Sequence, residues 1–397
     1  MAIKNGPTVI IVSPTESELT SRGKRHPELA ELLVRKGLNV RYLSTSFDHS
    51  AKTLFSDEEQ KTGKSRIPYI LDIVDVGMYR KNLSFARLLW NRRIARKAYD
   101  WLVNHATGKD VIIVPSRPPE VIFAAARAIK KTGARLLVDV RDIWPDGLGS
   151  RLKSISGFLF SVYCNHYLQK GLPNAHAFVH VADSFIPWLR RYYPKATSTF
   201  IPLGFSEKRW GKTLQSRNFV DRNIHIIHCG TLTLNFDVLP VLCAIRGNRN
   251  ITMTLVGESG TGERYASVMK YIAEHKMDEQ VKVLGVVSQE RVVQEYGKSD
   301  IALVPMTSGA LPNKFFDSLG AGTPILSLGE GDASRLVREH GLGWVAPFDE
   351  VAIKKVLDQC TPESLAYARK QISLIRLQFT RESLLEKYAD IIESLLR

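Results

Sequence analysis

Short apolar runs alternate with amphipathic segments along the first half of the chain. Val9–Val12 is a continuous apolar run that predicts a buried strand, and Pro27–Lys36 carries its leucines along one helical face. Gly37 ends that helix, and Val40–Leu43 predicts a second strand. A strand, a helix and a strand in this order predict a parallel, doubly wound α/β sheet.

The same alternation continues beyond a polar stretch at Asp48–Ser65, to which no element is assigned. We expect strands at Asp110–Pro115, Arg135–Asp139 and Ala177–Val181, and helices at Ser84–Asn104, Glu120–Lys131 and Ser154–Leu168. The stretch Ser206–Arg222 is polar and lacks periodicity, so we expect an interdomain linker there.

The second half repeats this pattern and predicts a second α/β domain. Strands are expected at Ile224–His228, Thr252–Val256, Val281–Leu284, Ile301–Val304 and Pro324–Leu328. Helices are expected at Val238–Ile245, Tyr265–Glu274, Gln289–Tyr296, Asn313–Leu319, Ser334–Glu339 and Glu350–Gln359, before a helical tail at Pro362–Leu396. The expected organisation is a domain at 1–205, a linker at 206–222, a domain at 223–375 and a C-terminal helix at 376–397 that packs back on the first domain.

Composition fits this two-domain globular interpretation. The chain has 397 residues, 44% of them hydrophobic, and its four cysteines form no C-x-x-C pair, which favours reduced thiols in the cytoplasm. The N-terminus does not read as a signal peptide, and no apolar run approaches the length of a membrane span. Residues 1–204 hold 31 Lys and Arg against 17 Asp and Glu, so most of the net charge of +15 belongs to a half that we expect to face an anionic partner.

The segment after the strand at Ile301 is a candidate anion site. The loop containing Gly309 and Ala310 leads into a helix N-terminus, where free N–H groups and the helix dipole favour negative charge. Lys314 adds a positive charge in the first turn, and Asp317 lies one turn further on the same face, where a carboxylate can accept hydrogen bonds from sugar hydroxyls. The alternative is an ordinary strand-loop-helix unit with a solvated lysine and aspartate.

Glycine loops follow three other strands of the second half, at Gly230, at Gly257–Gly262 and at Gly285. The carboxyl ends of parallel strands meet at one edge of a sheet, and glycine lets a backbone approach a phosphate or a base closely. The alternative is a set of turn glycines of the kind that any α/β protein contains.

Together these motifs resemble family 4 glycosyltransferases, whose fold is GT-B: two Rossmann-like doubly wound domains facing across a cleft. The resemblance covers nearly the whole chain and is closest to the subgroup that builds bacterial surface polysaccharides. It rests on the segments Ser21–Phe47, Asp139–Asp146, Phe200–Phe205, Leu255–Gly262, Val281–Val287, Ser299–Pro305 and Pro312–Leu326.

The resemblance implies transfer of a sugar from a nucleotide diphosphate, with retention at the anomeric carbon. The family carries two carboxylates on its donor loop; the first position falls on Gly309 and the second on Asp317, so this chain lacks one and shortens the other. The family's two phosphate-binding cations fall on Thr231 and Phe236. Lys314 therefore remains as the cation of the donor loop.

The resemblance also implies a donor-binding set in the second domain. Lys314 and the N–H groups of its loop would hold the diphosphate and stabilise its departure, and the backbone near Val286 would meet the nucleobase. The sequence has no D-x-D motif, so we expect no metal and no cofactor beyond the nucleotide-sugar substrate, of UDP or GDP type. The donor-binding set is Gly230, Thr231, Val286, Val287, Gly309, Ala310, Leu311, Asn313, Lys314 and Asp317.

In the first domain the resemblance points to the loop Arg22, Gly23 and Lys24 for phosphate and acceptor contacts. It also places Asp142 as a polar, candidate catalytic group that faces the acceptor; the alternative is a helix cap or a salt bridge to Arg141. His26 and His180 are interpreted as structural, as lone histidines more often are.

A basic segment between Val76 and Tyr99 holds seven Lys and Arg and no acid, interleaved with apolar residues. We expect it to dock on an anionic membrane surface through Arg87, Trp90, Arg92 and Arg93. The alternatives are nucleic-acid binding, for which no matching fold is recognised, and a merely solvated face.

The sequence therefore predicts a cytoplasmic glycosyltransferase, peripheral at the inner face of the cell membrane, that acts on a saccharide acceptor held on a lipid. Asp142, Lys314 and Asp317 are its candidate catalytic residues. The rival is a nucleotide-sugar-binding pseudoenzyme or partner subunit, favoured by the missing carboxylate and cations. The sugar, base, acceptor, linkage and oligomeric state are not encoded in any motif that we recognise.

Overall fold

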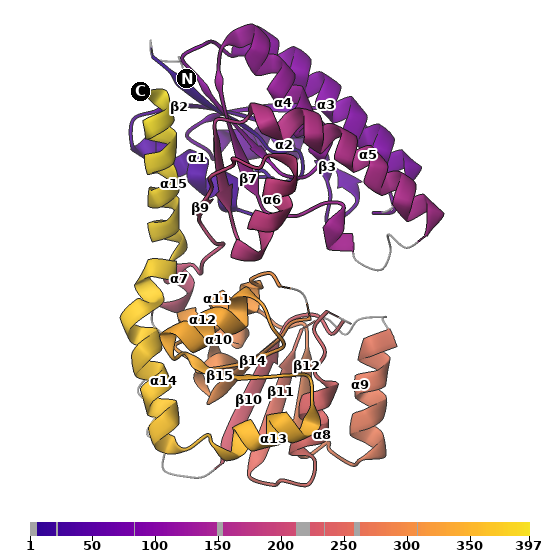
Figure 1. Ribbon diagram of the computed structural model, residues 1–397, viewed down its shortest axis with the longest axis vertical. Helices are drawn as coiled ribbons and strands as arrows, with labels where there is room; N and C mark the ends of the chain where they lie inside the picture. The colour runs from indigo at the N-terminus through magenta and orange to yellow at the C-terminus, as the bar shows by residue number, and fades with distance from the viewer. Residues whose placement is uncertain are drawn as a thin grey trace. The chain divides into compact units, whose positions relative to one another are not determined.

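The computed structural model of the chain describes residues 6–20, 23–82, 84–148, 154–211, 223–233, 235–257, 263–307 and 309–397. It divides into two compact units: Met1–Ile201 together with Leu385–Arg397, and Pro202–Leu384. Each unit is built on a parallel sheet with helices on its faces (Figure 1). The doubly wound α/β architecture that the alternating pattern predicts is thereby confirmed.

Among the described residues, the sheet of the first unit has the order β5-β2-β1-β6-β7-β8-β9. Its central strands are apolar and buried on both faces, as parallel strands covered by helices must be. The strands are β1 (Thr8–Val12), β2 (Asn39–Thr45), β5 (Ile70–Val74), β6 (Val111–Pro115), β7 (Arg135–Val140), β8 (Ala177–His180) and β9 (Thr199–Phe200), with a separate hairpin of β3 (Phe47–Asp48) and β4 (Thr53–Leu54).

Helices α3, α4 and α5 pack side by side over the first sheet (Figure 1). Directly after α1, Lys36 Nζ lies 3.1 Å from Glu386 and 3.3 Å from Glu393 of the C-terminal helix, so the end of the chain is part of this unit. The helices are α1 (Arg25–Arg35), α2 (Asp57–Ser65), α3 (Phe85–His105), α4 (Pro119–Thr132), α5 (Ile155–Gly171) and α6 (Ile186–Tyr192), with 3₁₀ turns η2 (Leu172–Asn174) and η3 (Asp183–Phe185).

Among the described residues, the second sheet has the order β12-β11-β10-β13-β14-β15, which is the 3-2-1-4-5-6 order of the Rossmann fold. The order reverses between β10 and β13, so the carboxyl ends of these two strands mark the switch point where such sheets bind ligands. The strands are β10 (Ile224–Cys229), β11 (Ile251–Val256), β12 (Val281–Gly285), β13 (Ile301–Pro305), β14 (Ile325–Leu328) and β15 (Gly343–Ala346).

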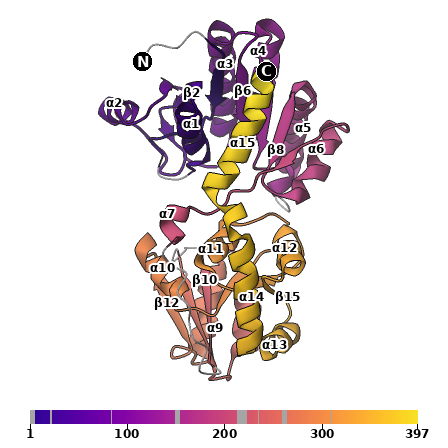
Figure 2. The same ribbon diagram turned by 90° about the vertical axis from the view of Figure 1, so that its left-hand side faces the viewer.

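Helix α8 packs against α9 and α13, α10 packs against α11, and α14 runs beside β15 (Figure 2). Apolar side chains from the sheet and from α8, α9 and α13 form one buried core. The helices are α7 (Glu207–Trp210), α8 (Leu239–Ile245), α9 (Glu263–Glu274), α10 (Gln289–Gly297), α11 (Asn313–Ala321), α12 (Asp332–His340), α13 (Glu350–Asp358), α14 (Pro362–Ile375) and α15 (Arg381–Leu396), with the 3₁₀ turn η4 (Arg376–Phe379).

The structure contains β5, α6, β9 and β15, which the sequence-based expectation did not include, and it differs from that expectation in three further segments. The polar stretch at 48–65 contains α2, which starts at a capping box in which Ser56 accepts from the Glu59 N–H and Glu59 accepts from the Ser56 N–H. The first residues of the expected linker form α7 in the second unit; 212–222 lie outside the described residues. The helical tail is interrupted before α15, where the Thr380 hydroxyl accepts from the Ser383 N–H at 3.2 Å.

Candidate functional site

Three loops at the carboxyl edge of the second sheet are brought together by direct backbone contacts. The Gly230 N–H donates to Val256 O at 2.8 Å, and the Gly257 N–H donates to Gly285 O at 2.9 Å. A Cβ at Gly257, where φ is +143°, would stand 2.3 Å from Gly230 O, so this approach requires glycine. The glycines that the sequence singles out therefore share one edge of the sheet.

Lys314 lies against this edge from the first turn of α11. Its terminal Cε and Nζ are both 3.1 Å from the point that a Cβ on Gly230 would occupy, and Nζ is 3.3 Å from the centroid of the Phe236 ring. The residue is 6% exposed, and Nζ forms no ion pair within the part of the chain that the structure describes. Lys314 is thus a buried cation with no carboxylate of the described residues within ion-pair distance.

Burial lowers the pKa of Lys314 to about 7, against the smaller opposing effects of Cys229 and Asp317. Burial and the charge on Lys314 also lower the pKa of His228 well below its usual range, so that imidazole is neutral. A bound anion would reverse the shift at Lys314, because a nearby negative charge favours the ammonium form. The arrangement can therefore bind a phosphate group while taking up a proton.

The loop before α11 is held near its start by two backbone hydrogen bonds. The Thr307 N–H donates to Asn235 O at 3.2 Å, and Gly309 O accepts from the Asp332 N–H at 3.0 Å. Helix α11 begins at Asn313 without a side-chain cap. Its first turn, to which Lys314 belongs, consequently presents N–H groups without intrahelical partners, as an anion site at a helix N-terminus requires.

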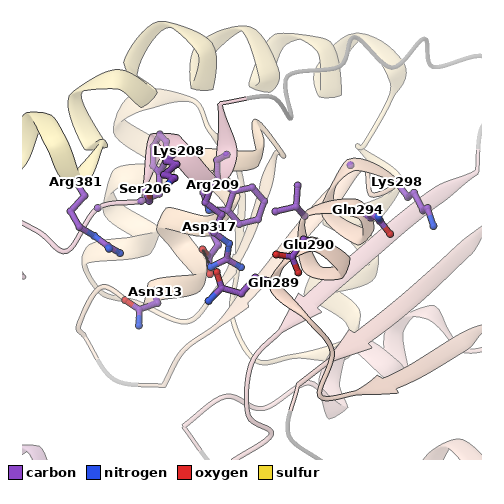
Figure 3. Close-up of a pocket in the computed structure, with 15 residues that line it drawn as sticks. Ser206, Lys208, Arg209, Gln289, Glu290, Gln294, Lys298, Asn313, Asp317 and Arg381 are labelled. Carbon is purple, nitrogen blue, oxygen red and sulfur yellow. Dashed lines mark ion pairs between the residues drawn. The ribbon is translucent and has the colours of Figure 1, made fainter. Parts of the chain in front are cut away.

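Asp317 lines a cavity of about 1060 Å³ in the second unit, which is drawn in Figure 3. Its carboxylate lies 3.7 Å from Arg209 Nη1 and accepts a hydrogen bond from the side chain of Trp210. Burial raises the pKa of Asp317, and Arg209 and Trp210 partly offset that rise. Asn313 also lines this cavity, and Gln289 and Glu290 from the start of α10 line its other side.

Arg209 was not singled out from the sequence. It belongs to α7, in the segment that the sequence predicts to be a linker. Its contact with Asp317 joins two residues that are far apart along the chain. The residue stacks 4.8 Å from the ring of Trp210, which is fully buried. The sequence signal that could have indicated an ordered segment is Trp210 itself, because a large apolar side chain is unusual in a flexible linker.

The other expected donor residues lie around this edge of the sheet. Thr231 is exposed directly after Gly230, and Val286 is exposed directly after β12, the edge strand. Val287, Gly309 and Ala310 are half-buried, and Leu311 is buried.

In the first unit, Asp142 follows β7 and forms an ion pair with Arg117, 3.2 Å away, instead of the salt bridge to Arg141 that the alternative considered. Arg141 pairs with Glu16. Asp142 is partly exposed, and its backbone N–H donates to Ser116 Oγ at 3.1 Å. It is therefore held rigidly at the carboxyl end of the strand.

The predicted acceptor loop of the first unit, Arg22 to Lys24, is followed directly by a buried charged cluster that includes Arg25 and His26. Arg25 Nε and His26 Nε2 each lie 3.0 Å from Asp139 Oδ2. Burial would raise the pKa of Asp139, but Arg25 and His26 outweigh it and hold that pKa well below its usual range. Lys24 Nζ is 3.3 Å from Glu18, and Gly23 is exposed; Arg22 lies outside the described residues.

Two of the four residues expected to contact a membrane are buried, and that expectation is wrong for them. Trp90 is 2% exposed and donates from Nε1 to Gly77 O at 2.9 Å. Arg87 is 6% exposed and donates to Asn82 O at 2.7 Å. They occupy the inward face of α3, whereas Arg92 and Arg93 lie on its exposed face.

Comparison with known proteins gives these sites a context. Residues 225–360 match the family described as glycosyl transferases group 1. Similar solved structures include a glycosyltransferase from Rickettsia africae (16% identity, TM-score 0.65, 99% of this chain and 100% of that one) and Anabaena HepE in complex with UDP (13%, 0.70, 98% and 100%). WaaG, a glycosyltransferase involved in lipopolysaccharide biosynthesis, is also similar (13%, 0.65, 97% and 99%).

The fold is GT-B. The resemblance to glycosyltransferases noted in the sequence is confirmed, and the family match lies within the second unit of the GT-B fold. No curated protein sequence matches the chain. Among the described residues, no helix is long and apolar enough to cross a membrane, and no cluster of three or more His, Cys, Asp or Glu could hold a metal ion.

Proposed function

We propose that this protein is a retaining, metal-independent glycosyltransferase that moves a sugar from a nucleotide diphosphate, of UDP or GDP type, to a saccharide acceptor. The observation that carries the proposal is Lys314, a buried ammonium without a carboxylate partner among the described residues, at the switch point of a Rossmann-like sheet. A diphosphate is the ligand that such a cation and a helix N-terminus together favour.

The donor would extend from this point along α11. Its diphosphate would lie at Lys314 and the loop containing Gly309, and its ribose would reach Asp317, which faces the cavity beside Arg209. The start of α10 and the residues after β12 would then meet the base. UDP is bound by Anabaena HepE, which has the same fold, and this supports the assignment by analogy alone.

In the transfer, the bond between the anomeric carbon and the phosphate oxygen breaks as the acceptor oxygen forms its bond to the same carbon. The acceptor proton passes to the leaving phosphate oxygen, so no protein base is required. Lys314 and the N–H groups of α11 would stabilise the negative charge that accumulates on the diphosphate. The remaining contribution is positioning of the two substrates.

Asp142 and the loop at Gly23 and Lys24 would face the acceptor. Asp142 is held by Arg117 and Ser116 and is partly exposed, which suits a hydrogen bond to an acceptor hydroxyl. We propose that the acceptor is linked to a lipid, that the pathway is surface polysaccharide or glycolipid synthesis, and that the protein is cytoplasmic and peripheral to the membrane.

The membrane contact is reassigned to exposed residues. Phe85 is 71% exposed at the start of α3, and Ile155, Phe158 and Leu159 are exposed at the start of α5. Arg92 and Arg93 lie on the exposed face of α3. Exposed apolar side chains with neighbouring cations suit insertion into an anionic interface.

The rival is a nucleotide-sugar-binding pseudoenzyme, favoured by Gly309 and Thr231 in place of charged residues. Donor binding measured by calorimetry, followed by a screen for donor hydrolysis and for transfer to lipid-linked acceptors, separates the two. We expect binding and turnover of at least one donor. Binding without turnover of any donor, with lipid acceptors supplied, would establish the pseudoenzyme instead.

A further inference from the structure

A second cavity, of about 290 Å³, lies in the first unit where the starts of α3 and α5 meet. Its walls are mostly apolar and include Phe85, Leu88, Trp144 and Phe160. The volume is close to the roughly 300 Å³ at which ligand pockets begin. Phe85 both lines the cavity and is 71% exposed, so the cavity adjoins one of the exposed apolar side chains described above.

One wall of this cavity is a buried cation. The Arg87 guanidinium lies 4.6 Å over the ring of Trp144, and its Nε is buried with no hydrogen-bond partner among the described residues. Arg87 also forms no ion pair with any described carboxylate. Burying a charged side chain by more than nine-tenths costs folding free energy when some of its hydrogen-bond donors have no partner, and a bound anion would supply the missing partner.

Two more cations lie close to Arg87. Lys52 has a left-handed backbone conformation, with φ +63°. Its Nζ donates a hydrogen bond to Asn82 Oδ1 at 2.6 Å, and Arg87 donates to the backbone O of the same residue. The Arg117 guanidinium lies 5.4 Å from the centroid of the Trp144 ring, which Arg87 also contacts. Lys52 Nζ lies 4.7 Å from the centroid of the Tyr79 ring, and the Arg87 guanidinium lies 5.4 Å from the same centroid, so these two cations share one ring.

The nearby carboxylates are engaged elsewhere. Glu120 accepts from Tyr163 Oη at 2.7 Å and from Asn91 Nδ2 at 3.2 Å, and Asp48 accepts from two backbone N–H groups of its own turn. Asp142 pairs with Arg117. Arg87 and Lys52 are therefore left with positive charge that no described carboxylate neutralises within ion-pair distance.

From this geometry we propose that the cavity binds the phosphate-proximal part of a lipid that carries a phosphate or diphosphate. Its apolar chain would lie against Phe85, Leu88 and Phe160, and its phosphate would lie on Arg87, which lines the cavity, and on Lys52, which contacts the lining residue Asn82. This inference rests on the proposed function, since the lipid would be the carrier of the acceptor. Arg117, which contacts the ring of the lining residue Trp144, also pairs with Asp142 at 3.2 Å. The site thus joins the membrane-facing surface to the acceptor-facing residue.

The test is calorimetric titration of farnesyl diphosphate, a water-soluble lipid diphosphate, into the full chain. We expect binding at least tenfold tighter than that of inorganic diphosphate or of the C15 alcohol alone. Lys52→Ala and Arg87→Leu should each weaken it at least tenfold. Arg96→Ala, which removes an exposed cation of the same helix, should leave it unchanged.

Thermal unfolding measured on the same samples shows whether each variant is folded. Nucleotide-sugar binding measured on them shows whether the donor site is intact, so a failure of the lipid site can be told from a failure of the proposed function. If Arg87→Leu does not fold, Lys52→Ala at its half-exposed position carries the test. Equal binding by wild type and Lys52→Ala would overturn the site even if the donor still binds. Displacement of farnesyl diphosphate by dispersed anionic phospholipid at equal concentration would reassign the cavity to bulk membrane lipid and overturn the acceptor assignment.

Discussion

Lys314 Nζ lies 3.1 Å from the point that a Cβ on Gly230 would occupy. The absence of a side chain at the end of β10 is therefore what admits the ammonium to the edge of the second sheet. This contact joins a helix N-terminus to the glycine loops of neighbouring strands, and several measurable consequences depend on it.

The first consequence concerns Gly230 itself. We predict that Gly230→Ala weakens nucleotide-sugar binding about tenfold or more, because the methyl group displaces Lys314. Gly247→Ala is the matched control, since Gly247 also has a positive φ but has nothing within 4 Å of its Cβ position. Both substitutions cost backbone strain, so a loss of affinity shared equally by the two variants would contradict the role of the Lys314 contact.

The second consequence is a pH dependence of donor binding. The pKa of Lys314 is about 7 in the free protein, and a bound diphosphate would raise it. Above pH 7 binding must take up a proton, so the donor Kd should rise with pH by up to about tenfold per unit, with little change below pH 7. Calorimetry with a nucleotide sugar, whose phosphates stay ionised throughout, measures this slope.

Lys314→Arg serves as the control for that slope. Arginine stays protonated across this range, so the variant should bind the donor with an affinity that changes little between pH 6.5 and 8.5. A wild-type Kd that is flat over the same range would show that the ammonium does not contact the diphosphate.

A third prediction concerns stability without ligand. The folded-state pKa of Lys314 lies below its usual value of 10.5, so the cost of burying the charge is fully present below pH 7 and is relieved as pH rises toward 10.5. Lys314→Met should therefore raise Tm at pH 6, by roughly 2–4 °C for each kcal/mol of relieved cost, and its advantage should shrink by pH 10. A Tm difference between Lys314→Met and the wild type that increases with pH would contradict a lowered folded-state pKa of Lys314.

A fourth prediction tests the membrane contact. Replacing both Phe85 and Phe158 by serine should reduce co-sedimentation with anionic vesicles, because these exposed rings supply the apolar contact. Arg92→Gln with Arg93→Gln should weaken it by about tenfold or more, at about 1 kcal/mol per charge. Lys354→Gln with Lys355→Gln, exposed on α13, is the control; an equal loss there would indicate non-specific attraction.

Much of the fold could be predicted from periodicity, since buried parallel strands and amphipathic helices leave strong local patterns. The placement of Lys314 and Asp317 on adjacent turns of one helix could be predicted because it depends on local sequence alone; their role as a donor site stays a prediction. Arg209 was missed because its partner Asp317 is remote in sequence. Arg87 and Trp90 were placed on the surface because charge composition alone does not reveal which face of α3 packs inward.

The most direct test of the central claim is calorimetric titration of UDP- and GDP-sugars into the wild type, Lys314→Ala, Asp317→Ala and the exposed control Lys355→Ala. We predict that at least one donor binds the wild type and Lys355→Ala equally. Each site variant should bind it at least tenfold more weakly, as expected for contacts to charged groups of about 1.5–3 kcal/mol. Equal affinity in all four proteins would contradict the assignment of the donor site to Lys314 and Asp317.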